Sequence, residues 1–356
     1  MLLPLMLTQH SLHHHQQLAQ KMIGQTVIDI KLISGGRNSR AYKTICQDSN
    51  YVFKVYIRNE NDQRDRLATE FSSLRFLEKC GMDNVPRAII ADPENNCAVY
   101  EYVNAEKITN GDIKDQDIDQ AVSFLNILEG LKRYTVGKNI GAASEACFSF
   151  SAIWENIYKR CRDISISTQN EAAYPELYNF FQKQFNPAMK QIEAWCSYKL
   201  IEASLKPETE LDFVHRTLSP SDFGFHNALR KLDGELVFLD FEYFGWDDPA
   251  KMVVDVLHHP GMSLSISQKR HFVKGILKHF HDYPKLMERI EIVYPLYGLK
   301  WCLILLNEFL PDRLLLRKFA GVNTEDVQTL QSQQLNKARL LLKDTLYKYD
   351  DFPYFN

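Results

Sequence analysis

Two aspartates and one asparagine in the stretch SPSDFGFHNALRKLDGELVFLDFEYFGWDDP, residues 219–249, could together activate a hydroxyl group and hold a hard cation. Asp222 and Asn227 lie five residues apart among turn-forming residues, so a loop can present a carboxylate to a substrate hydroxyl and an amide oxygen to magnesium. The Asp-Gly pair that follows predicts a β-hairpin, which returns Asp240 beside Asn227. Mg²⁺ prefers one or two protein oxygen ligands together with phosphates. We therefore predict that Asn227 and Asp240 bind Mg²⁺ and that Asp222 handles the proton.

Asp222-Phe223-Gly224 also spells the metal-binding triplet of protein kinases, which would imply a different division of roles. In that interpretation the base should lie upstream, around His215-Arg216-Thr217. Threonine cannot serve as the base, and no asparagine follows it at the right distance. We therefore interpret the triplet as a coincidence.

Lys54 is a charged residue inside the apolar run Val-Phe-Lys-Val-Tyr. A buried ammonium group is costly unless it has an anionic partner. The next helical segment offers Glu70, on the same face as Leu67 and Leu74, in preference to Glu78 at the end of that segment. The alternative is that Lys54 simply extends past a sheet edge into solvent.

The segment SGGRNS, residues 34–39, lies between two predicted strands, and its glycines can turn backbone amides toward an anion. The alternative is a plain hairpin turn. Transfer of a γ-phosphoryl group requires positioning and positive charge more than covalent chemistry. The glycine turn, Lys54 and the three polar residues above together favour a phosphotransferase.

The elements that must position these residues form a small sheet followed by helices. Strand and helix periodicities alternate before residue 104, and Gly81 supplies a helix stop. Helical periodicity then dominates, with Pro187 expected to interrupt one segment. The predicted strands are within 26–45, 51–57, 96–103, 212–215 and 236–240, and the predicted helices are 65–81, 117–134, 174–205, 268–283, 289–310 and 335–349.

This pattern predicts an α+β fold with two lobes. We expect an N-terminal tail or short polar helix over residues 1–25, an antiparallel-sheet lobe with one helix over 26–104, and a larger helical lobe over 105–356. The first lobe would bind nucleotide. The second would carry the catalytic loop and the acceptor site.

Composition excludes several classes of protein. The 356 residues are 45% hydrophobic and 24% charged, an ordinary globular balance, and the net charge of −3 argues against nucleic-acid binding. Seven cysteines without a Cys-x-x-Cys pair predict neither disulfides nor structural zinc, which favours the cytoplasm. The opening MLLPLML is too short for a signal peptide, and no run approaches the ~18 apolar residues of a membrane span.

From about residue 28 to 310, the sequence resembles the aminoglycoside phosphotransferase and choline kinase-like family, which shares the protein-kinase fold. The resemblance rests on Asp222-x4-Asn227 followed by LVFLDFEYFGWDDPAKMVVD. It implies a two-lobed kinase-like fold, Mg²⁺, and ATP or GTP as the phosphoryl donor. It also implies that Asp222 is the base or positions the hydroxyl, and that Asn227 and Asp240 bind the metal.

The same resemblance assigns a nucleotide site, with Lys54 as the phosphate-binding lysine, Glu70 as its helix partner, and a connector that hydrogen-bonds adenine through its backbone. The implied nucleotide-binding residues are Gly35, Gly36, Ser39, Lys54, Glu70, Tyr100, Glu101, Tyr102 and Val103. One departure is Pro220, because the family usually has histidine two residues before the catalytic aspartate. We expect a differently braced but working loop.

The expected acceptor is the hydroxyl of a sugar, an aminoglycoside or an amino alcohol, and the segment YPLYGLKWCLILLNEFLPD is a candidate wall of its site. Aromatic residues there could stack on a sugar or hold a cation, although Tyr297 and Trp301 could equally pack the core. Lys300 argues against a wholly cation-seeking pocket, and we expect Asp248 and Asp255 to fix loop and helix ends. The candidate substrate residues are Glu242, Tyr243, Trp246, Tyr297, Trp301 and Glu308.

Two other functions remain open on the sequence. Pro220 favours a nucleotide-binding scaffold without turnover, whereas Asp222, Asn227 and Asp240 oppose it. A protein kinase is the second alternative. After Asp240, however, the chain reaches GWDDPAKMVVDVL without a long activation segment, which favours a small-molecule acceptor.

Overall fold

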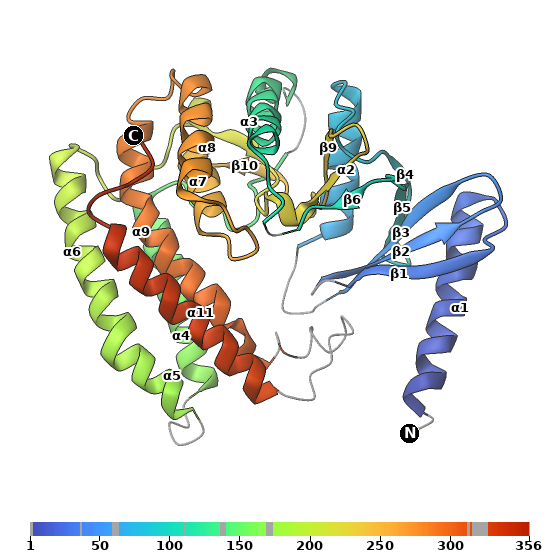
Figure 1. Cartoon of the computed structure of the whole chain (residues 1–356), viewed down its shortest axis with the longest axis horizontal. Helices are drawn as coiled ribbons and strands as arrows, with labels where there is room; N and C mark the ends of the chain where they lie inside the picture. The colour runs from blue at the N-terminus through green and yellow to red at the C-terminus, as the bar shows by residue number, and fades with distance from the viewer. Residues whose placement is uncertain are drawn as a thin grey trace. The chain divides into compact units, whose positions relative to one another are not determined.

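The computed structural model describes residues 3–35, 38–58, 64–109, 111–135, 140–168, 174–311, 314 and 327–355. The chain forms two compact units (Figure 1). The first contains the described residues of Met1–Lys107 together with Ala228–Tyr243. The second contains those of Ile108–Asn227, Phe244–Leu315 and Asn323–Asn356.

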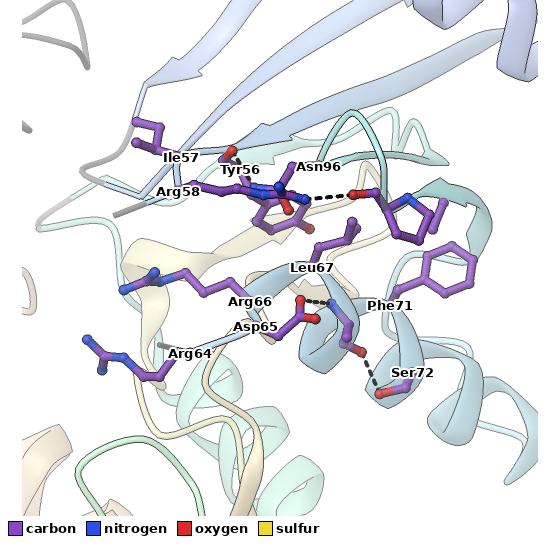
Figure 2. A pocket seen from close by; sticks show the side chains of 13 residues that line it. Tyr56, Ile57, Arg58, Arg64, Asp65, Arg66, Leu67, Phe71, Ser72 and Asn96 are labelled. Carbon is purple, nitrogen blue, oxygen red and sulfur yellow. Dashed lines mark hydrogen bonds between the residues drawn. The ribbon is translucent and has the colours of Figure 1, made fainter. Parts of the chain in front are cut away.

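An antiparallel five-stranded sheet and one helix beside it make up most of the first unit. The strand order is β1-β2-β3-β5-β4, and α2 (Arg66–Lys79) follows β3, with the Asp65 carboxylate capping its first turn by accepting from the Ala68 amide (Figure 2). These elements confirm the predicted sheet lobe with a helix, and β4 is an addition to it. The strands are β1 (Asp29–Gly35), β2 (Ser39–Ile45), β3 (Asn50–Tyr56), β4 (Ala88–Asp92) and β5 (Cys97–Glu101).

The N-terminal segment is a long helix, α1 (Leu3–Ile23), and belongs to the first unit. Ala19 is fully buried in a core cluster with residues of β1, β2, β3 and β5, and Leu18, Met22 and Ile23 pack against the same cluster. These apolar positions recur at helical spacing on one face, so the helix is anchored to the sheet. The segment expected as a tail or a short polar helix is therefore a long helix and an integral part of this unit (Figure 1).

The predicted hairpin after Asn227 is present. Strands β8 (Ala228–Arg230) and β9 (Leu236–Phe238) pair antiparallel, and Gly234 takes a positive φ of 91° in the turn between them. Strand β6 (Glu106–Lys107) pairs with β8, so this small sheet completes the first unit. The expected division placed all residues after 104 in the helical lobe, whereas Ala228–Tyr243 lies with the sheet.

Helices build the second unit around α9, as predicted for the C-terminal part of the chain. Helix α11 runs alongside α9 (Figure 1), and α4, α6 and α7 also pack on it. The segment Leu286–Phe309 has the length and apolar character of a membrane span, but 83% of its most apolar window is buried inside the fold. The helices are α3 (Asp115–Gly130), α4 (Phe150–Ser167), α5 (Pro175–Phe180), α6 (Asn186–Glu202), α7 (Pro249–His258), α8 (Ile266–His279), α9 (Leu286–Leu305) and α11 (Val327–Lys348).

Two local predictions had different outcomes. Pro187 does mark an interruption, because a π-helical turn, Phe181–Phe185, precedes it and α6 begins there. The predicted strand at 212–215 is wrong: Phe213–His215 is a short 3-10 helix, closed by a hydrogen bond from the His215 amide to the Asp212 carbonyl. The strand lies just after it, as β7 (Thr217–Ser219), and pairs with β10 (Gly245–Asp247).

Candidate active site

Lys54 lies at the centre of an ionic cluster in the first unit. Its Nζ is 2.7 Å from Glu70 Oε2 and 2.9 Å from Asp240 Oδ1, and Glu242 Oε2 lies 3.8 Å away. Lys54 sits on β3, Glu70 on α2, and the two acidic residues follow β9. The predicted pairing of Lys54 with Glu70 is confirmed, and Glu78 has a different partner, Arg75.

Two tyrosines extend this cluster at Glu70. The Tyr56 hydroxyl donates to Glu70 Oε2 at 2.7 Å and lies 2.6 Å from the Tyr100 hydroxyl. All three side chains are buried, and burial raises the pKa of Glu70 while Lys54 opposes that shift. The sequence singled out Tyr100 for its backbone, but its side chain also serves this network.

The cluster contains more negative charge than Lys54 alone can balance. Burial would lower the pKa of Lys54, but Asp240, Glu70 and Glu242 raise it well above its usual value. Burial and the charge of Asp240 raise the pKa of Glu242 to about 7. Carboxylate oxygens of the three acidic residues lie within 4.8 Å of one another. Such a set of hard oxygen donors fits Mg²⁺.

The glycine turn between β1 and β2 is connected to this cluster through Asn38. Its Nδ2 donates to Glu242 Oε1 at 2.8 Å and to the Tyr243 hydroxyl. Gly35 ends β1 and Ser39 begins β2, as the predicted strand-turn-strand requires. Gly36 lies outside the described residues.

The predicted adenine connector begins at the end of strand β5 and continues beyond it. Tyr100 and Glu101 end β5, and Tyr102 and Val103 come directly after it. The Glu101 amide donates to the Arg87 carbonyl, and Lys43 Nζ lies 4.1 Å from the Tyr102 ring centroid. The segment is therefore fixed at the end of the sheet that carries Lys54.

In the second unit, Asp222 lies in the loop between β7 and the short 3-10 turn Phe225–Asn227. Two histidines face its Oδ1: His226 Nε2 at 3.2 Å and His259 Nε2 at 3.6 Å. Their rings stack with centroids 3.9 Å apart, and the Trp301 ring meets His259 edge-on at 4.8 Å.

These contacts keep Asp222 ionised. Burial alone would raise its pKa, but the hydrogen bond and charge of His226 and the charge of His259 lower it below the usual value. Neither histidine was singled out by sequence reasoning. A signal existed for His226, which stands four residues after Asp222 in the same tight loop, but none for His259. Asn227 Nδ2 donates to the Asp222 carbonyl at 3.0 Å, so a metal would take the amide oxygen.

Ser221 braces the loop beside the unusual Pro220. It has a positive φ of 67°, its amide donates to Ser219 Oγ, and its hydroxyl donates to the Ser144 carbonyl at 2.7 Å. Lys251 Nζ in turn donates to Ser221 Oγ at 3.2 Å, and this lysine is held by Asp247 and Asp255. These hydrogen bonds brace the loop next to Pro220.

The candidate acceptor residues are distributed unevenly. Trp301 borders the Asp222 loop through His259 and donates its Nε1 hydrogen to Asp255. Tyr297 and Glu308 are almost fully buried, and Trp246 is buried on β10 against Phe213. The burial of Tyr297 matches the alternative given above, in which this residue packs the core.

The two other candidate acceptor residues lie in the first unit, and Asp248 has the structural role expected for it. Glu242 and Tyr243 lie in the first unit, beside Lys54 and Asn38. Asp248 accepts from the Ala250 amide and caps α7, as predicted for a residue that fixes a helix end. From Asp240 the chain reaches β10 and then α7 at Pro249, a short connection that agrees with a small-molecule acceptor.

An antiparallel-sheet unit with a lysine–glutamate pair, followed by a mainly helical unit with a polar aspartate loop, defines the class: a phosphotransferase with the two-lobed protein kinase-like α+β fold. The sequence profile described as the phosphotransferase enzyme family matches residues 29–289. The chain belongs to this family. It is a small-molecule kinase that uses a nucleotide donor and a hydroxyl acceptor.

Solved structures share the fold at low sequence identity. Choline kinase LicA from Streptococcus pneumoniae is 17% identical with a TM-score of 0.59, over 93% of this chain and 99% of that chain. Spectinomycin phosphotransferase APH(9)-Ia in complex with ADP and spectinomycin is 12% identical with a TM-score of 0.59, over 94% and 98%. The gentamicin complex of APH(2")-IIa is 17% identical with a TM-score of 0.56, over 94% and 97%. None of the curated proteins compared with the chain matches it in sequence.

Proposed function

We propose that this protein transfers the γ-phosphoryl group of ATP or GTP to the hydroxyl of a small molecule that carries an amine, either an amino alcohol or an aminoglycoside. The observation that carries the proposal is the position of Lys54 Nζ, within 3 Å of both Glu70 and Asp240. A sugar without an amine is the remaining member of the acceptor class.

The first group of proposed roles concerns binding of the nucleotide donor. Lys54, positioned by Glu70, binds the donor phosphates, and the backbone around Gly35, Gly36 and Ser39 covers them. Tyr100 to Val103 bind the adenine or guanine base.

Asp240 and Asn227 are the proposed Mg²⁺ ligands. The metal would supply positive charge to the phosphate oxygens, as in other phosphoryl transfers.

Asp222 accepts the hydroxyl proton of the acceptor. Its lowered pKa supports this role, because an ionised carboxylate is available at neutral pH to receive the proton. His226 and His259 orient the carboxylate through Oδ1.

Acceptor choice rests on the surroundings of the Asp222 loop and on the related structures. Trp301 offers an aromatic surface beside His259, and an amine would be attracted to its ring and to the carboxylates nearby. Choline kinase, ethanolamine kinase and the gentamicin complex are named among the structures with this fold. All seven cysteines are free, which supports the proposed cytoplasmic location.

The test is a screen that follows ADP or GDP release across choline, ethanolamine, several aminoglycosides and several hexoses. Turnover restricted to amine-bearing acceptors supports the proposal, and turnover on hexoses alone contradicts it. Asp222→Asn should lower turnover roughly 10²–10⁴-fold while nucleotide still binds. Asp240→Ala should instead weaken Mg²⁺-dependent nucleotide binding, and interchangeable effects of the two variants would refute the division of roles.

A nucleotide-binding scaffold is the second candidate, favoured by Pro220 in the Asp222 loop. Nucleotide binding with no product from any acceptor would favour it.

A further inference from the structure

The turn that follows α7 packs directly on the Asp222 loop. This turn covers residues 259–262, and both segments belong to the second unit. Met262 Sδ accepts a hydrogen bond from the Phe225 amide at 3.4 Å. Gly224 leaves room for this contact, because a Cβ atom there would lie 2.6 Å from Met262 Sδ. The close approach brings a histidine of the turn to the carboxylate of the loop.

His259 is the first residue of this turn, and a backbone amide determines which nitrogen of its ring carries the hydrogen. The Gly261 amide donates to His259 Nδ1 at 3.1 Å. A ring nitrogen that accepts a hydrogen bond has no hydrogen of its own, so the neutral ring carries its hydrogen on Nε2. Burial and the neighbouring His226 lower the pKa of His259 to about 4, so the ring is neutral at pH 7. Nε2 is the atom that faces Asp222 Oδ1, at 3.6 Å.

Contacts between aromatic rings limit how far this N–H group can turn. The His226 and His259 rings are nearly parallel, with centroids 3.9 Å apart and 7° between their planes. The Trp301 ring meets His259 edge-on at 4.8 Å, and its Nε1 donates to Asp255 at 2.9 Å. Aromatic rings prefer such stacked and edge-on contacts. His259 is therefore held by two neighbouring rings and a backbone amide.

The same cluster has the composition of a metal site, but the Gly261 contact argues against that role. Asp222, His226 and His259 offer ligand atoms within 4.8 Å of one another, and two imidazoles with one carboxylate can bind a transition metal. A metal on His259 Nε2 would move the ring hydrogen to Nδ1. There it would point at the N–H group of Gly261, whereas a metal-bound histidine normally donates that hydrogen to an acceptor. The contact favours a hydrogen-bond donor at Nε2 over a metal ligand.

The two oxygens of the Asp222 carboxylate have different surroundings. His226 Nε2 and His259 Nε2 both face Oδ1, at 3.2 Å and 3.6 Å. Within the described part of the chain, no hydrogen bond or ion pair reaches Oδ2. The side chain is 38% exposed, so one oxygen is held by the protein while the other is available to a bound molecule.

We propose that His259 is a positioning residue, which directs its Nε2 hydrogen at Asp222 Oδ1 and so presents Oδ2 to the acceptor hydroxyl. In the transfer step, the acceptor oxygen bonds to the γ-phosphorus while its proton moves to Oδ2. The bond between that phosphorus and the bridging oxygen breaks, and the nucleoside diphosphate leaves with the electron pair. This reaction step deepens the proposed function and rests on it, whereas the tautomer of His259 does not.

The tautomer is tested by ¹⁵N NMR on the full chain labelled at its histidine nitrogens, with the His259 signals assigned by their absence in His259→Gln. At pH 7 we expect a protonated Nε2 and an unprotonated Nδ1. A protonated Nδ1 overturns the proposal. A change to that tautomer on addition of Zn²⁺ also overturns it, because the cluster would then be a metal site.

The positioning role is tested with His259→Met and His259→Gln, using an acceptor that gives turnover in the screen above. Methionine removes the donor, whereas the glutamine amide can place an N–H group near the position of Nε2. His259→Met should lower kcat roughly 10–10²-fold, the scale of a small misplacement of a catalytic group, and His259→Gln should restore most of it. Nucleotide affinity should stay unchanged in both variants, because Lys54 and Glu70 belong to the first unit.

His271→Met is the matched control and should leave kcat unchanged. His271 lies on α8 and also faces an aspartate, Asp119, at 2.6 Å. A kcat equal to that of the parent protein in His259→Met overturns the positioning role. An equal loss in His259→Met and His259→Gln, with nucleotide affinity kept, overturns the assignment of the Nε2 hydrogen as the cause.

A further measurement does not depend on these variants. A crystal structure of the parent protein with a non-hydrolysable ATP analogue and the acceptor should place the acceptor hydroxyl on the Asp222 oxygen that neither histidine faces. A hydroxyl bound to the other oxygen overturns the proposal. If the parent protein phosphorylates no acceptor, the proposed function fails while the NMR measurement still decides the tautomer.

Discussion

Lys54 in the first unit and Lys251 in the second are both buried lysines held by several carboxylates, yet their surroundings differ. Lys251 contacts Asp247 at 2.7 Å and Asp255 at 3.0 Å, with side chains 2%, 0% and 14% exposed. Lys54 has Glu70, Asp240 and Glu242 around it, and the Asp240 side chain is 33% exposed. The first cluster is open at one carboxylate and the second is almost sealed.

The carboxylates of the two clusters also differ in their surroundings. Asp255 also accepts a hydrogen bond from Trp301, so the carboxylates around Lys251 have protein partners. Around Lys54, the pKa of Glu242 is raised to about 7, because burial and Asp240 act on it together. A sealed cluster stabilises a fold, whereas a cluster with a partly exposed carboxylate, as at Asp240, is suited to receive a cation. Burial of a lysine alone does not separate these two roles.

The largest expected effect is on stability, from Lys251→Met. Removing the lysine leaves Asp247 buried without its cation, which typically costs about 3–5 kcal/mol. Chemical denaturation should show this loss in the free energy of unfolding. Adding Asp247→Asn should recover part of it, because the uncompensated charge is then gone. An unchanged unfolding midpoint in the single variant would show that Lys251 is not the structural partner described here.

Lys54→Met should affect activity more than stability. Losing a preorganised cation at the phosphates should lower kcat/KM roughly 10²–10³-fold, the usual scale for one lost electrostatic contact. The melting temperature should fall less than in Lys251→Met, because Asp240 can be hydrated. The comparison between the two lysines breaks if Lys54→Met unfolds the protein as strongly as Lys251→Met does.

Sequence reasoning succeeded where a local rule carried the information. Helical periodicity placed Glu70 on the face toward Lys54, and the Asp-Gly turn predicted the hairpin that returns Asp240 to the sheet. These are short-range patterns with one dominant physical cause. The division of the site into lysine, carboxylates and catalytic loop followed from them, while the functional roles stay predictions.

Sequence reasoning missed features that depend on tertiary packing. The pairing of His226 with His259 around Asp222 joins a loop to the residue after α7, and no spacing rule connects them. Helix α1 was expected as a tail or a short polar helix, because the apolar stripe around Ala19 is interrupted by polar residues and its burial depends on the sheet. The run at 212–215 has strand-forming residues, yet Phe213 and Val214 are exposed in a 3-10 turn.

His258 on α7 extends the comparison of buried basic groups. Its hydrogen-bond partner is a backbone carbonyl, whereas the two lysines are held by carboxylates. Its Nε2 lies 2.8 Å from the Tyr294 carbonyl. Burial, with a smaller contribution from Lys269, lowers its pKa from 6.5 to about 4. The unfolded chain therefore binds more protons between pH 6.5 and 4, and stability is complete above pH 6.5 and falls as the pH drops through this window.

The loss attributable to His258 should be at most about 3 kcal/mol by pH 4. His258→Gln removes the titration while keeping a donor, so its unfolding free energy should depend less on pH over this window. Parallel pH profiles for the variant and the parent protein would contradict the assignment.

The smallest expected effect concerns the contact that joins the sealed cluster to the catalytic loop. Ser221→Ala removes the hydrogen bonds to the Ser144 carbonyl and from Lys251, at a cost of about 1 kcal/mol each. Thermal unfolding should detect a modest loss, and turnover should fall because the Asp222 loop is less well fixed. Ser221→Gly is the matched control. It loses the same bonds but relieves the positive φ, so it should be more stable than Ser221→Ala.

The inclusion of Ala228–Tyr243 in the first unit also sets the order in which a growing polypeptide can form the ionic cluster around Lys54. Lys54 and Asp240 are 186 positions apart, so the chain must be synthesised beyond Asp240 and leave the ribosome before this pair can form. A nascent fragment that stops at Lys107 would contain Lys54 and Glu70 without the other two carboxylates. Nucleotide capture during translation is therefore expected to begin only after the hairpin has emerged.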